Sequence, residues 1–98
     1  MEFIIKQAIE NKQLLSFVYH DKTRLVEPYT FGQSKHGKDT LSAFQIEGGS
    51  DDSQDLCWRQ FALREIKNLK LMDEKFIELR EDYDPENARM SFVYWTVK

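Results

Sequence analysis

The chain has 98 residues, of which 41% are hydrophobic and 32% charged, and its formal net charge is −3. This length suits one compact domain, and the composition is that of a soluble globular protein. The acidic balance argues against a broad footprint on duplex DNA but leaves room for a local basic pocket. Cys57 is the only cysteine, which excludes an intrachain disulfide framework and a cysteine-based zinc site. No apolar stretch reaches the length of a membrane span and the first residues lack a signal-peptide core, so we expect a cytoplasmic protein without a membrane partner.

The first element predicted is a short amphipathic helix in "FIIKQAIENK", residues 3–12. Ile5, Ala8 and Ile9 repeat at helical spacing, which places them on one face. Glu2 near the start and Lys12 near the end match the helix dipole.

Short strands follow the helix. Composition and alternation predict strands at 14–20, 23–31, 39–47 and 56–63, and a fifth that contains Ile66, Leu69 and Leu71. The expected connections are a tight turn at 21–22, loops at 32–38 and 48–55, and a turn between Leu63 and Ile66. Pro28 predicts an edge, a bulge or a sharp bend, because proline cannot donate to a strand ladder. This order predicts a mainly β (α+β) domain, with an N-terminal helix and a small, strongly bent antiparallel sheet or barrel.

The C-terminal part has a different pattern. Phe76, Leu79 and Arg80 keep helical spacing, which predicts a short helix at 74–82, and "YDPENA" then breaks the chain. "SFVYWTVK", residues 91–98, predicts a strand with large apolar side chains on both faces. Such a strand is buried either by joining its own sheet or by pairing with a second copy or another protein, and we favour the intermolecular route.

"IKQAIENKQLLSFVYHDKTRLVEPYTF" resembles the opening of a WYL domain, and "WRQFALREI" resembles a later segment of that family. The likeness covers residues 3–73, so we divide the chain into a WYL-like core, 1–73, and an extension, 74–98. Where the family has Trp-Tyr-Leu this chain has Asp39-Thr40-Leu41, and Ala62 stands where the family usually has arginine. The resemblance implies a five-stranded Sm-like, SH3-type barrel with an extra C-terminal strand. It also implies a bacterial or phage role in transcription regulation, exerted by a stand-alone module through a partner or an oligomer.

The resemblance further implies a basic pocket that binds nucleic-acid or nucleotide-like ligands. The ligand-binding residues we expect are Tyr19, Lys38, Arg24, Arg59 and Arg64. Guanidinium groups offer a planar fork to phosphate, and aromatic rings offer a stacking surface to bases. The alternatives are that the arginines pair with acidic residues on neighbouring strands, that Tyr19 belongs to the core and that Lys38 lies in a solvated loop. Trp58 is either a stacking platform or a packing residue.

Catalytic patterns are weak. Cys57 has no local partner that would position it with His20 or His36, the Asp51, Asp52 and Asp55 cluster lacks a calcium-loop pattern, and no phosphate-binding glycine motif occurs. We therefore expect a protein without catalysis, metal or cofactor that binds a nucleotide or short single-stranded nucleic acid. The alternative is an interaction module that has lost its ligand and docks a partner or a second copy through Phe92, Tyr94 and Trp95. The Asp39-Thr40 pair favours this alternative, since it removes aromatic surface and adds negative charge.

Overall fold

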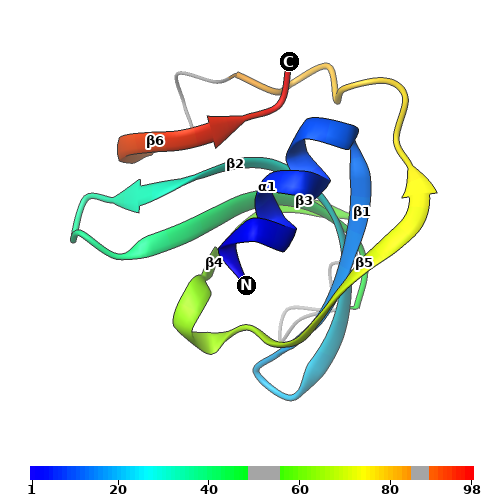
Figure 1. The fold of residues 1–98 in the computed structure, drawn as a ribbon, viewed down its shortest axis with the longest axis horizontal. Helices are drawn as coiled ribbons and strands as arrows, with labels where there is room; N and C mark the ends of the chain where they lie inside the picture. Colours follow the sequence, from blue (N-terminus) through cyan, green and yellow to red (C-terminus); the bar gives the residue numbers. More distant parts are fainter. Residues whose placement is uncertain (49–55, 85–88) are drawn as a thin grey trace.

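The structure is a computed structural model that describes residues 1–48, 56–84 and 89–98. It is mainly β, with one N-terminal helix and an antiparallel sheet (Figure 1). The elements are α1 (Glu2–Asn11), β1 (Gln13–Tyr19), β2 (Lys22–Ser34), β3 (Asp39–Glu47), β4 (Cys57–Ala62), the 3₁₀ turn η1 (Leu63–Glu65), β5 (Lys67–Lys75) and β6 (Met90–Thr96). Most of the expected loop at 48–55 and part of the break at "YDPENA" lie outside the described residues.

The strand order explains the curvature of the sheet. Neighbouring strands follow the order β4-β3-β2-β1-β5, and β6 pairs with β2. β4 and β5 stand at opposite ends of this order, yet only η1 and Ile66 separate them in the chain. So short a connection requires the sheet to bend until its two ends approach each other. Figure 1 shows this bend, with α1 lying in the curve. The described ladders do not close the sheet.

α1 covers the core with the face that the sequence predicts. Ile5, Ala8 and Ile9 are buried there. Lys12 ends the helix in the left-handed conformation (φ 54°), and its N–H bonds to the carbonyls of Ala8 and Ile9. The Lys12 carbonyl accepts a hydrogen bond of 2.9 Å from the Phe76 N–H, which joins the helix end to the segment after β5.

The first hairpin turns one residue earlier than predicted. His20 and Asp21 have φ of 50° and 65°, and Tyr19 pairs with Lys22 across the turn. Two adjacent left-handed residues are typical of a type I′ turn, whose twist matches that of the flanking strands. The prediction of a turn centred on 21–22 was therefore wrong by one position.

β2 continues through the proline that we expected to disturb it. Its register with β3 shifts between Pro28 and Thr30, which agrees with the bulge that was one of the three outcomes expected at Pro28. The strand then runs on to Ser34, so the first three residues of the loop predicted at 32–38 are strand. Beyond the bulge β6 lies against β2, and Gly32 allows the close approach: a Cβ on Gly32 would lie 3.0 Å from the Val93 Cα.

The helix predicted at 74–82 is absent. β5 continues to Lys75, and the chain then crosses the sheet without regular helix as a segment that we call the strap, residues 76–84. The strap contacts the sheet face that carries Glu27, Phe44 and Trp58, which are register partners on β2, β3 and β4. The tertiary contacts of the strap stabilise it in this conformation more than the helical spacing of its side chains would stabilise a helix.

β6 joins its own sheet, so the intermolecular route we favoured is not needed to pair this strand. It pairs with β2 from Thr30↔Thr96 to Ser34↔Met90. Among the described residues, no helix is long and apolar enough to cross a membrane.

Candidate functional site

Two of the predicted site residues, Tyr19 and Arg24, lie together at the β1–β2 hairpin. The Arg24 guanidinium lies 5.7 Å from the centre of the Tyr19 ring, and its Nη2 donates to the Tyr19 carbonyl at 3.2 Å. Its Nη1 donates to Gln45 Oε1 at 2.9 Å, and only 5% of Arg24 is exposed. Arg24 is therefore buried inside the fold, where Tyr19 and Gln45 accept hydrogen bonds from its guanidinium, rather than presented at the surface.

Tyr19 connects the hairpin to η1. Its hydroxyl accepts a hydrogen bond from the Ala62 N–H at 3.1 Å and donates to Glu65 Oε2 at 3.3 Å. Burial, followed by the charge of Glu65, raises the pKa of Tyr19. Because Phe61 packs edge-on against its ring and His20 stacks on it, Tyr19 has a clear packing role.

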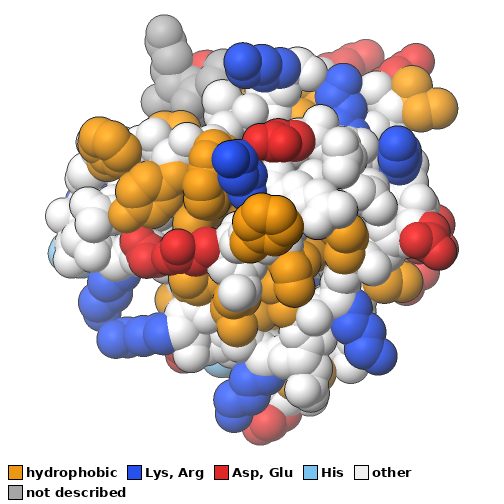
Figure 2. Space-filling model, in the orientation of Figure 1, with side chains coloured by type: hydrophobic (Ala, Val, Ile, Leu, Met, Phe, Trp, Pro, Cys, Tyr) orange, Lys and Arg blue, Asp and Glu red, His pale blue; other side chains and the backbone are white. Residues whose placement is uncertain are grey.

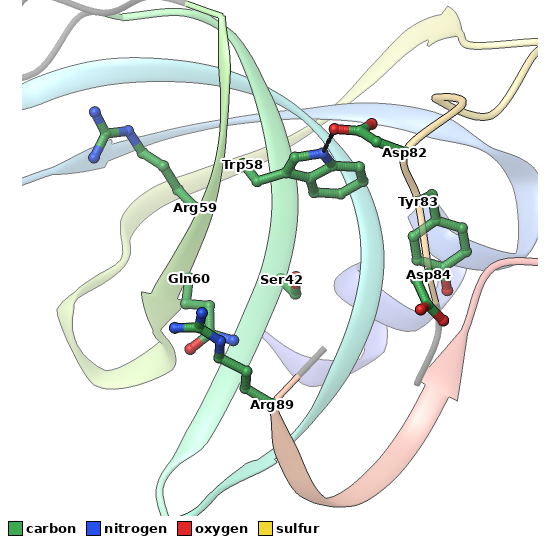
Figure 3. Close-up of a pocket in the computed structure, with 8 residues that line it drawn as sticks. All are labelled: Ser42, Trp58, Arg59, Gln60, Asp82, Tyr83, Asp84 and Arg89. Carbon is green, nitrogen blue, oxygen red and sulfur yellow. Dashed lines mark hydrogen bonds between the residues drawn. The ribbon is translucent and has the colours of Figure 1, made fainter. Parts of the chain in front are cut away.

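Arg59 lies at a cavity of about 510 Å³ beside β4, which we call the β4 cavity. Figure 3 shows Arg59 and Trp58 leaving β4 in opposite directions, with the strap beyond Trp58. The cavity is lined by Ser42, Trp58, Arg59, Gln60, Asp82, Tyr83, Asp84 and Arg89. Its walls thus come from β3, β4, the strap and the residue before β6.

An aromatic cluster forms the apolar wall of the β4 cavity. Trp58 stacks with Tyr83 at 5.9 Å between ring centres and an angle of 25°, and it meets Phe44 and Tyr29 edge-on. The Trp58 Nε1–H donates to Asp82 Oδ2 at 2.9 Å, which fixes the indole in its plane. The ring is half-buried, so it packs in the cluster and also faces the cavity.

Charge is divided across the β4 cavity. Arg59 and Arg89 are the cations of the lining, with the Arg59 guanidinium directed away from Trp58, while Asp82 and Asp84 lie on the strap (Figure 3). Such a cavity suits a ligand with an anionic end and hydrogen-bond donors elsewhere, rather than a simple polyanion.

Lys38 and Arg64 lie at a different cavity. Its volume is about 460 Å³, and we call it the η1 cavity. It is lined by Met1, Lys38, Asp39, Ala62, Leu63, Arg64 and Ile66. The five predicted residues are therefore spread over three places, because strand alternation does not determine which strand ends converge once the sheet bends.

Little in the sequence indicated that the strap takes part in the site. Its anchor is Arg80, whose side chain binds Glu27 and whose N–H donates to the Tyr29 hydroxyl at 2.9 Å. Asp82 and Tyr83 follow after Glu81 and line the β4 cavity. The available signal was the density of aromatic and charged residues between Phe76 and Asp84, but we predicted a helix there from the spacing of Phe76, Leu79 and Arg80.

The described residues contain no group of three or more His, Cys, Asp or Glu side chains that could hold a metal ion. No family model, curated protein or solved structure matches this chain.

Proposed function

We propose that this protein is a non-enzymatic regulatory module that binds a nucleotide or a short single-stranded nucleic acid in the β4 cavity. The observation that carries the proposal is that an aromatic wall and two arginines, Arg59 and Arg89, line one cavity. Its volume of about 510 Å³ is within the range of small-molecule sites, roughly 300–1,000 Å³.

Each part of a nucleotide has a chemical counterpart there. The guanidinium groups of Arg59 and Arg89 suit phosphate oxygens. The accessible part of the Trp58 ring suits a base, which stacks on aromatic surfaces whatever its identity. Sugar hydroxyls and base amino groups are donors, and the carboxylates of Asp82 and Asp84 are acceptors.

The resemblance to WYL domains supports the same class of ligand, and we propose that the chain is a member. The Sm-like, SH3-type barrel is part of this proposal. It is supported by the bend that brings the two ends of the sheet to either side of η1. A module of this kind would act in the cytoplasm through a partner protein or an oligomer.

The second candidate function is protein interaction through β6. Phe92 is 61% exposed and Val93 42% exposed, although both belong to a strand already paired with β2. Figure 2 shows hydrophobic side chains gathered over α1 and β6 on one face. Exposed apolar patches of this kind mark association surfaces.

The test is a titration with mononucleotides and short single-stranded oligonucleotides at two salt concentrations, in which Trp fluorescence reports binding. We expect Arg59→Gln and Arg89→Gln each to weaken binding by about 1–3 kcal/mol. Affinity should also fall as salt rises. Lys70→Gln, at an exposed position of β5, is the matched control and should leave mononucleotide affinity unchanged.

Thermal melts establish that the variants are folded. Arg89→Gln is the more informative of the two variants, because the Arg89 side chain is exposed and its replacement removes no buried packing. If neither arginine substitution alters affinity, or if no nucleotide or oligonucleotide binds, the ligand-binding proposal is wrong and the interaction module becomes the better interpretation.

A further inference from the structure

The η1 cavity is a second concave site, separate from the one assigned to nucleotides. It lies one step further along the β3–β4 ladder: Ser42 and Gln60 are register partners beside the β4 cavity, and the next partners on that face are Thr40 and Ala62. Ala62 lines the η1 cavity, whereas Gln60 lines the other. No residue lines both cavities.

The floor of the η1 cavity is apolar and fixed in place. Leu63 and Ile66 reach the same side because η1 makes one 3₁₀ turn, closed by a hydrogen bond of 3.1 Å from the Ile66 N–H to the Leu63 carbonyl. Ile66 is only 3% exposed, and Ala62 is tied by its N–H to the Tyr19 hydroxyl. Met1 lines the cavity and is 53% exposed, so apolar surface there stays in contact with water.

The rim is cationic. Lys38 and Arg64 are both exposed, and the described parts of the chain show no ion pair for either side chain. The acidic group of the lining, Asp39, is turned to a protein partner, since its Oδ1 accepts a hydrogen bond of 2.9 Å from the Tyr94 hydroxyl. Two cations above an apolar floor are complementary to an anionic head on an apolar body.

We propose that the η1 cavity binds a small amphipathic carboxylate, with the carboxylate between Lys38 and Arg64 and the apolar part against Leu63, Ile66 and Met1. A volume of about 460 Å³ accommodates such a molecule. This inference does not depend on the nucleotide proposal, because the two cavities have different linings.

Octanoate is the probe, and octanamide is its uncharged match. We expect octanoate to bind and to shift the NMR amide signals of Asp39, Ala62, Leu63 and Ile66, and octanamide to bind at least about threefold more weakly. Lys38→Gln and Arg64→Gln should each raise the Kd for octanoate about threefold to tenfold. Lys70→Gln, on β5, is the control and should leave the Kd unchanged.

Asp39→Asn should change the Kd for octanoate in the direction opposite to Lys38→Gln and Arg64→Gln. It removes a negative charge from the cavity while the amide oxygen still accepts from Tyr94, so the Kd for octanoate should fall about twofold to fivefold. Equal affinity for octanamide, no response to Lys38→Gln and Arg64→Gln, or signal shifts outside the η1 cavity would overturn the inference. Octanoate binding that persists in Arg59→Gln, whose nucleotide binding we expect to be weakened, would show that this site stands apart from the β4 cavity.

Discussion

Arg80 holds the carboxylate of Glu27 with two hydrogen bonds, from Nε to Oε1 at 3.0 Å and from Nη2 to Oε2 at 2.9 Å. Glu27 is 6% exposed and belongs to β2, whereas Arg80 belongs to the strap, so this pair joins segments 53 residues apart. The Arg80 guanidinium also lies 4.1 Å from the centre of the Phe44 ring. The hydrogen bonds to Glu27 raise the pKa of Arg80. The strap is therefore attached at the point from which Asp82 and Tyr83 continue into the β4 cavity.

Removing one member of this pair should destabilise the fold. Arg80→Ala leaves a buried carboxylate without its cation, and we expect the free energy of unfolding to fall by about 2–3 kcal/mol, with the value reduced from that of a fully buried pair because Arg80 is partly exposed. Urea unfolding measures the change. Lys75→Ala, an exposed cation just before the strap, is the control and should change stability by less than about 0.5 kcal/mol.

The double variant Glu27→Leu with Arg80→Met tests the cause. If the loss in Arg80→Ala comes from the uncompensated carboxylate, this pair of apolar side chains should recover much of it. A double variant that loses as much stability as the two single variants added together would contradict the view that the uncompensated Glu27 carboxylate causes the loss in Arg80→Ala.

Gly32 should be required for the position of β6. A larger side chain there meets the backbone of Phe92 and Val93, so Gly32→Val should displace β6 and lower stability by more than about 2 kcal/mol. Gly37→Ala is the matched control: it has open space around its Cβ and suffers only from its φ of 75°, which costs about 1 kcal/mol. Gly32 itself has no positive φ, so a Gly32→Val loss no larger than that of Gly37→Ala would show that contact with β6 is not the main cost of the substitution.

Stability should decline at alkaline pH through Tyr29. Burial raises the pKa of Tyr29 to about 12, and the neighbouring Glu27 carboxylate contributes in the same direction. The unfolded chain loses this proton near pH 10, so the stabilisation is complete below pH 10 and is lost as the pH rises toward 12. The expected decline from this residue is about 2 kcal/mol. Tyr29→Phe should show a shallower decline over that interval in urea unfolding; an identical pH dependence would exclude Tyr29 as the cause.

Association through β6 should depend on Phe92 and Val93. If two copies pair there, Phe92→Ser with Val93→Thr should convert the dimer to monomer at micromolar concentrations in sedimentation velocity. Ile77→Ser is the control, because Ile77 is 88% exposed but lies on the strap. A wild-type protein that stays monomeric throughout this concentration range would refute the homodimer.

Local pattern determined most of the secondary structure. The strand at 39–47 was predicted with the bounds that β3 has, since its alternation of buried and less buried residues is a local property. Ile5, Ala8 and Ile9 likewise identified the buried face of α1. The missing N–H of Pro28 predicted a local disturbance of the strand, and the register with β3 shifts there.

Long-range contacts decided the rest. Phe76, Leu79 and Arg80 have helical spacing, but Glu27 and Tyr29 hold Arg80 in an extended strap, and burial with paired charges outweighs weak helix propensity. The resemblance to WYL domains implied one basic pocket for Tyr19, Arg24, Arg59, Lys38 and Arg64. Their separation into a buried pair and two cavities depends on how far the sheet bends between β4 and β5, and a one-dimensional pattern carries no measure of that bend.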